Sequence, residues 1–270
     1  EVVRGVIRLC KEAGARRVLV ADNPIEAPEA CFARSGIGDV VRAEGAELVL
    51  PAPADFVTLV VRNHRPDPLQ SEALGRWPMF ATPLAAATKV IGVAPVKDHN
   101  LCSASMNLKN WYGLLGGRRD QFHQAIHHVI SDLAMVFSPT LVIADATRVM
   151  MSNGPTGGRK SDVEPGGLLG RAAVVASVDP VACDAWCYEN LLGRDPANLA
   201  YLDLASRKIA PQIAQGAKRF AERDWRVYAN VDHFEQLEMS LPLEVLPRAW
   251  DVIIVQGPAG DPGRLGAWDN

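Results

Sequence analysis

The chain has 270 residues, of which 48% are hydrophobic and 22% are charged, and its net charge is −3 at pH 7. This composition is typical of a globular protein and argues against a wholly disordered one. Acidic residues slightly outnumber basic ones, 31 to 28, which argues against a basic nucleic-acid-binding surface. No apolar run approaches the roughly 18 residues of a membrane span. We therefore expect neither a nucleic-acid partner nor a membrane span.

The five cysteines indicate free thiols. Their number is odd, their spacing is scattered, and no C-x-x-C pair occurs, so they predict no disulfide framework. Buried thiols in a reducing compartment are the simplest interpretation, and the cytoplasm is the expected location. The sequence opens at Glu1 directly in a helical pattern, and we expect an upstream strand to be missing from the domain.

Helices alternate with short apolar strands through most of the chain. The first part of the pattern predicts a helix over 2–12 stopped by Gly14, a strand over 17–22, a short helix over 38–43, a strand over 47–50 and an edge strand over 56–62. A loop over 64–76 leads into a small helix, and a strand over 88–96 follows, broken at its end by Gly92 and Pro95. The pattern then predicts a helix over 119–137, strands over 140–145 and 171–177, and a helix from Asp179-Pro180 to about 192.

This alternation predicts an α/β fold: a mostly parallel sheet with helices on both faces, layered as in a Rossmann fold. We assign residues 1–205 to this domain and leave 206–270 as an irregular C-terminal extension of unassigned structure. Around and within the extension, residues 196–222 look helical, 225–228 and 250–255 look extended, and 257–263 look like a loop.

The richest polar segment, residues 97–110, follows directly on a predicted strand. It therefore lies at the carboxyl edge of the sheet, where open parallel sheets bind ligands. The segment carries two cations, an imidazole and neutral hydrogen-bonding groups, a mixture that suits a small anionic ligand: Lys97, His99, Ser105, Lys109 and Asn110. The alternative is a solvated polar loop.

Two histidines on the predicted helix over 119–137 lie close to this segment. With Asp120, His123 and His127 fall within about 60° of one another on a helix. His at i and i+4 can share a metal ion, but no third ligand is evident, and we predict no metal. We expect His99 or His123 to act as general acid or base, while Lys97 and Lys109 neutralise the substrate. Plain packing is the alternative for the helical histidines.

The glycine-rich segment 153–160 and the start of the next helix complete the candidate site. Asn153, Gly154 and Gly157 lie in a loop whose backbone N–H groups can approach an anion closely. The loop lacks the spacing of a P-loop, so we interpret it as a flap over the ligand or as a plain surface loop. Asp179 caps the following helix or binds the ligand, and capping alone accounts for it well.

These segments, in this order, resemble the bacterial and archaeal family called domain of unknown function 362, from about Val2 to Ala205. The matching residues are Lys97-Asp-His99, Ser105, Leu108-Lys-Asn110, Gly113, Arg119, His123, Ile130-Ser-Asp-Leu133, Asp145, Asn153-Gly-Pro155, Gly157, Ala176-Ser-Val-Asp-Pro-Val-Ala182 and Asp184. The resemblance adds Arg119 to the candidate ligand-binding residues.

The resemblance implies an α/β domain, often exported through a twin-arginine signal or joined to a ferredoxin-like iron–sulfur module. Export is therefore the alternative to a cytoplasmic location, if a signal precedes residue 1. The cysteine pattern of the iron–sulfur module is missing here, so the cofactor is unknown and no cluster is expected on this chain. The strand with a Lys-x-Asn turn that usually opens the family is also absent.

We expect an enzyme that acts on a small anionic metabolite in a redox-associated pathway, with a ferredoxin-like protein as a possible redox partner. One alternative is a non-catalytic protein that binds or delivers an anion or cofactor. Another is a scaffold subunit of a redox complex that docks a partner through Trp225, Trp250 and Trp268. The sequence indicates neither the reaction nor the oligomeric state.

Overall fold

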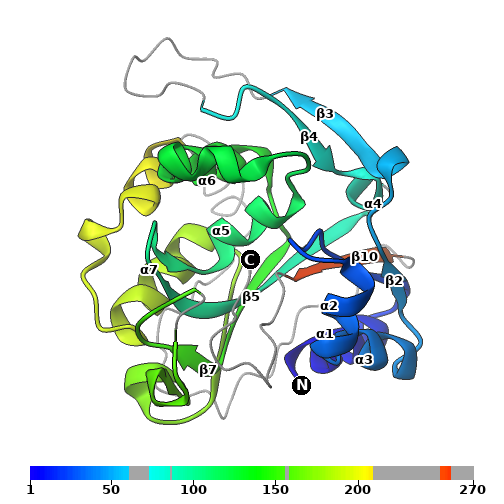
Figure 1. Cartoon of the computed structure of the whole chain (residues 1–270). Helices are drawn as coiled ribbons and strands as arrows, with labels where there is room; N and C mark the ends of the chain where they lie inside the picture. The colour runs from blue at the N-terminus through cyan, green and yellow to red at the C-terminus, as the bar shows by residue number, and fades with distance from the viewer. Residues whose placement is uncertain (61–72, 86, 156–157, 209–249, 257–270) are drawn as a thin grey trace, which may run out of the picture.

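The computed structural model describes residues 1–60, 73–85, 87–155, 158–208 and 250–256. Their main sheet has the strand order β2-β1-β10-β5-β7-β8, with β6 paired to β5 and β9 paired to β7 (Figure 1). The strands are β1 (Ala15–Ala21), β2 (Glu47–Val49), β5 (Lys89–His99), β6 (Ser103–Ser105), β7 (Leu141–Met150), β8 (Val163–Glu164), β9 (Ala173–Ser177) and β10 (Trp250–Gln256).

Helices of the described residues surround this sheet, and a separate antiparallel ribbon lies beside it (Figure 1). The ribbon consists of β3 (Phe56–Val60) and β4 (Arg76–Phe80). The helices are α1 (Val2–Glu12), α2 (Pro28–Arg34), α3 (Ile37–Ala43), α4 (Thr82–Ala85), α5 (Asn107–Asn110), α6 (Ile126–Val136) and α7 (Pro180–Asn190), with 3₁₀ turns that include η3 (Trp111–Leu114) and η4 (Arg119–Ala125).

Both faces of the sheet carry a hydrophobic core, because side chains alternate along each strand. On β1, Val18 and Val20 pack into one core with α1 and α3. Leu19 and Ala21 point the other way, into a core built with α5, α6 and α7. Residues 3, 6, 7 and 10 of α1 form its buried stripe at helical spacing. The fold is therefore α/β with helices on both faces, as predicted.

The sheet is mixed, which corrects the prediction of a mostly parallel one. Strands β2, β1, β10, β5 and β7 run parallel, whereas β6, β8 and β9 pair antiparallel to their neighbours. A parallel connection needs a crossover of a dozen or more residues, usually a helix. Between β7 and β9 the described residues contain only short 3₁₀ turns and β8, and β9 accordingly returns antiparallel.

Strand β10 lies in the middle of the sheet, between β1 and β5, and runs parallel to both. One segment beyond residue 205 thus belongs to the main sheet. The division of the chain at that residue stays a prediction. Of the other expectations for this region, residues 200–208 are helical, while 209–249 and 257–270, with Trp225 and Trp268, lie outside the described residues.

Three predicted elements differ in the structure, each for a local reason. Residues 76–80 are a strand paired with β3 instead of loop and helix. Strand β5 does not end at Pro95: its pairing with β7 shifts register there, as proline at a bulge permits, and it continues to His99. The predicted helix over 119–137 begins as 3₁₀ turns, and at their start the carbonyl of Arg119 accepts a hydrogen bond from the Tyr112 hydroxyl at 2.6 Å.

All five cysteines are free, and four of them are buried. Among the described residues, no helix is both long enough and apolar enough to cross a bilayer.

Candidate functional site

The candidate site is built on the hairpin that β5 forms with β6 beyond the end of the parallel sheet. Lys97 pairs with Ser105 and His99 with Ser103. Between them on β5, Asp98 forms an ion pair with Arg194 at 2.6 Å, and the same guanidinium donates to the Ser103 carbonyl at 2.7 Å. This contact fixes the hairpin, and with it the side chains of Lys97 and His99.

The short helix α5 supplies the other basic side chain, and Asp184 of α7 holds that helix in place. One oxygen of Asp184 accepts hydrogen bonds from the backbone N–H and the side-chain amide of Asn107, at 3.0 and 3.1 Å, and the other accepts from the Leu108 N–H at 2.9 Å. The carboxyl is fully buried, and burial raises its pKa to about 7. Asp184 therefore positions Lys109 and Asn110 without reaching a cavity.

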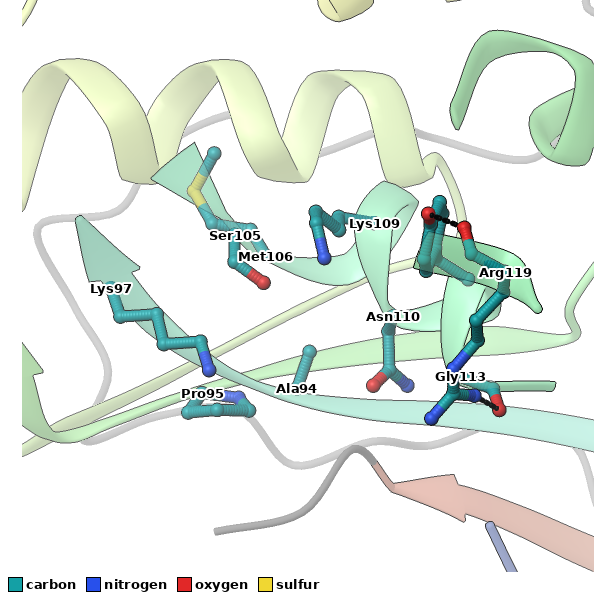
Figure 2. A pocket seen from close by; sticks show the side chains of 10 residues that line it. Ala94, Pro95, Lys97, Ser105, Met106, Lys109, Asn110, Gly113 and Arg119 are labelled. Carbon is teal, nitrogen blue, oxygen red and sulfur yellow. Dashed lines mark hydrogen bonds between the residues drawn. The ribbon is translucent and has the colours of Figure 1, made fainter. Parts of the chain in front are cut away.

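A small inner chamber lies between the hairpin and α5. Its volume is about 20 Å³, room for about one or two water-sized groups. Its polar walls are Lys97, Ser105, Lys109, Asn110, Tyr112 and Arg119. In Figure 2 the amines of Lys97 and Lys109 point into the same space, with Ser105 and Asn110 beside them. The chamber thus gathers four of the predicted ligand-binding side chains, together with Lys97.

Lys109 is the least compensated charge of the chamber. Its side chain is only 4% exposed, and within the described part of the chain no oxygen accepts a hydrogen bond from its ammonium. The contact that the structure does provide is the Tyr112 ring, whose centroid lies 4.7 Å from the nitrogen. Burial lowers the pKa of Lys109 to about 8. An anion in the chamber would supply the partner that the described residues do not.

His99 is held as a neutral hydrogen-bond donor. Its Nδ1 accepts from the Leu101 N–H at 3.1 Å, so the proton of the neutral ring lies on Nε2. Burial, and then the charges of Lys109 and Lys97, lower its pKa to about 2. The imidazole therefore stays uncharged at neutral pH and lines the second cavity as a donor.

That second cavity is an open cleft of about 500 Å³, which shares Lys109, Tyr112 and Arg119 with the inner chamber. Polar groups on its walls include His99, Asp120 and His123, and its apolar walls include Pro24, Ile25, Phe56, Leu115 and Pro155. His123 is exposed and stacks at 6.4 Å on the Tyr112 ring. Arg119 anchors one nitrogen on the carbonyls of Asn23 and Leu115, at 2.8 and 3.1 Å.

A family model described as Domain of unknown function (DUF362) matches residues 1–189 of this chain. The chain belongs to this family. The match confirms the resemblance predicted from the sequence, and it spans every residue that lines the chamber and the cleft. No curated protein and no solved structure matches the chain.

Asp22 was not among the predicted site residues of this DUF362 member, yet it lies against the chamber wall. It follows the last residue of β1 and is buried. Its Oδ1 has no hydrogen-bond partner among the described residues, and a Cβ on Gly113 would come within 2.9 Å of that oxygen. Burial raises the pKa of Asp22 to about 7, against the lowering effect of Arg119. Its position at the carboxyl end of a parallel strand was the signal that could have identified it.

The glycine-rich segment is placed differently from the other predicted residues. The N–H of Gly154 donates to the Asp98 carboxylate at 2.9 Å, so this amide is already occupied. A Cβ there would come within 2.0 Å of the Asp98 carbonyl oxygen, which explains the glycine by close packing. Asn153 bonds Ser152 at 3.4 Å and lines neither cavity, and Gly157 lies outside the described residues. Pro155 is the residue of this segment that reaches the cleft.

Asp179 caps α7: its Oδ1 accepts from the N–H groups of Val181 and Ala182, at 2.9 and 3.0 Å. It lines neither the chamber nor the cleft. Among the described residues, no group of three His, Cys, Asp or Glu side chains is arranged to hold a metal ion. The geometry thus gathers cations and neutral donors around two neighbouring cavities that share Lys109, Tyr112 and Arg119.

Proposed function

We propose that this DUF362 protein binds a small organic anion at Lys109, which lines both the inner chamber and the cleft, and that it acts on this anion as an enzyme. The observation that carries the proposal is the buried ammonium of Lys109, which no acceptor among the described residues compensates and which faces both cavities. Lys97 and Arg119 add positive charge, and Ser105 and Asn110 add neutral hydrogen-bonding groups.

In this proposal the two histidines have different tasks. His99 donates a hydrogen bond from Nε2 to the bound anion, because its Nδ1 is occupied by the Leu101 N–H. His123 stands exposed at the cleft wall and is the general acid or base. The redox-associated pathway and the ferredoxin-like partner stay predictions from the family resemblance.

A binding or delivery protein is the second candidate, and the state of His99 favours it. Because His99 is held neutral, the cleft has one side chain fewer that can exchange protons than acid–base catalysis by both histidines would need.

If the protein is an enzyme, we expect His123→Gln to leave anion affinity within about twofold while abolishing turnover, since general acid–base catalysis contributes about 10²–10⁴-fold.

The measurement exposes the wild-type protein and His123→Gln to a metabolite extract, follows small acids by mass spectrometry, and measures anion affinity by calorimetry. Depletion of one acid by the wild type alone supports the enzyme. An acid that both proteins retain without conversion would identify a binding protein.

The affinity for anions is expected to fall as pH rises from 6 to 9. Asp22, with a pKa raised to about 7, becomes negative in this range. Lys109, with a pKa lowered to about 8, loses its positive charge. Both changes disfavour an anion, and a single coupled proton changes affinity about tenfold per pH unit.

Calorimetric titrations with benzoate at several pH values test this dependence. In Asp22→Asn the decline is expected to begin only near the pKa of Lys109, because the carboxylate that forms first is gone. An affinity of the wild type that stays constant between pH 6 and 9 would contradict the assigned roles of both residues.

A further inference from the structure

The two neighbouring cavities differ in size and in chemistry, and this difference bears on the kind of anion. The chamber is narrow and polar, at about 20 Å³, while the cleft is wide, at about 500 Å³, and partly apolar. Lys109, Tyr112 and Arg119 form the boundary between them. One ligand that uses both cavities therefore has a small charged head and a larger body.

The chamber sets an upper limit on the size of the ligand's charged head group. A water molecule needs about 10–15 Å³ of such a cavity, so the chamber accepts one or two water-sized groups. A carboxylate brings two oxygens, whereas a sulfonate or a phosphate ester brings three unesterified ones. Lys109 would meet the carboxylate as a point charge, and Ser105 and Asn110 lie within the same walls (Figure 2).

The walls of the cleft indicate what chemistry the body of the ligand has. Phe56 of β3 faces it, and the ring is packed so closely on the neighbouring backbone that a Cβ on Gly116 would come within 2.6 Å of it. Ile25, Leu115 and Pro155 extend this apolar wall. Cavities of this volume bind small molecules mainly through apolar contact, with a few polar groups that fix orientation.

Resting on the proposed anion site, we infer that the ligand is a carboxylic acid with an apolar or aromatic body: the carboxylate enters the chamber between Lys97 and Lys109, and the body lies against Phe56 in the cleft. We expect phosphorylated and sulfonated compounds to bind more weakly, because their three-oxygen heads are larger than a carboxylate and the chamber is small. Binding by this inference involves no covalent step.

Calorimetry on the full chain with four probes tests the inference. Benzoate, benzenesulfonate and phenyl phosphate share a ring, and the first two also share a single negative charge, so their comparison separates head size from charge. Acetate has the same head as benzoate without the ring. Benzoate is expected to bind at least tenfold more tightly than each of the other three.

Phe56→Ala is expected to remove most of the preference for benzoate over acetate while leaving the affinity for acetate unchanged. Val57→Ala is the matched control, because Val57 neighbours Phe56 on β3 but is 49% exposed and lines neither cavity. Benzenesulfonate or phenyl phosphate binding as tightly as benzoate would overturn the carboxylate inference and leave the anion site standing. Binding of none of the four would overturn both.

Discussion

Replacing Lys109 with methionine is expected to weaken benzoate binding roughly 10- to 150-fold, the equivalent of about 1.5–3 kcal/mol for a hydrogen bond to a charged group. The ammonium is the one cation on the walls of both cavities whose nitrogen meets no oxygen among the described residues. Methionine has nearly the same length and fills the same space, so the loss reports the charge and not a cavity.

The same substitution is expected to leave the protein as stable as before, or more stable. Burying an ammonium without an anionic partner is unfavourable, and burial has already lowered the pKa of Lys109 to about 8. An apolar side chain removes that cost, although it also loses the contact with the Tyr112 ring. Affinity should therefore fall without a loss of stability, a combination that general damage to the fold would not produce.

Calorimetry gives the affinity, and urea unfolding gives the stability. Lys11→Met is the matched control, because Lys11 is exposed on α1 and donates to the backbone carbonyl of Gly45, remote from both cavities. It should leave benzoate affinity unchanged. Lys109→Met with wild-type affinity would remove the basis of the proposed function.

Replacing Asp184 with alanine should lower the free energy of unfolding by at least about 3 kcal/mol, because each of its three hydrogen bonds leaves unpaired a buried donor that costs about 1–3 kcal/mol. The donors are the backbone N–H groups of Asn107 and Leu108 and the side-chain amide of Asn107. Since α5 carries Lys109, benzoate affinity should fall together with stability.

Asp179→Ala gives the comparison within the same helix, since an N-cap typically contributes about 0.5–2 kcal/mol and Asp179 lines neither cavity. The stability of Asp184→Asn should lie between those of the two alanine variants. Its amide keeps one acceptor oxygen but turns a donor towards the Leu108 N–H. Urea unfolding at pH 7 measures all three variants. An Asp184→Ala protein no less stable than Asp179→Ala would show that α5 does not depend on this carboxyl.

The sequence pattern predicted those features that depend only on residues close together in the chain. The stripe of α1, from Val3 to Cys10, and the Asp179 cap of α7 were both legible in the sequence. The direction of β9 was not, because alternating burial looks the same in parallel and antiparallel strands. The 3₁₀ start at Arg119 also escaped prediction, because over one or two turns the periods of 3.0 and 3.6 residues are hard to tell apart in a sequence.

The candidate site was predictable to the extent that it follows the carboxyl edge of the sheet. Lys97, Ser105, Lys109 and Asn110 come together because the consecutive elements β5, β6 and α5 deliver them there. Asp22 comes from a strand far away in sequence, and its approach depends on the missing side chain of Gly113. The state of His99 depends on how deeply the hairpin is buried, which residue types alone do not indicate.

The central position of β10 has a consequence for how the protein folds. Val18 and Val252 are register partners although more than 200 residues separate them, and β5 meets β10 across more than 150 residues. Contacts between such distant segments cost loop-closure entropy before they stabilise anything, and they slow folding. Until β10 arrives, β1 and β5 each expose an edge of unpaired backbone N–H and C=O groups, to which a strand of another chain can pair and cause aggregation. During synthesis both edges stay unpaired from the time when β5 emerges until β10 has emerged. Chaperones that shield strand edges should therefore matter most in that period.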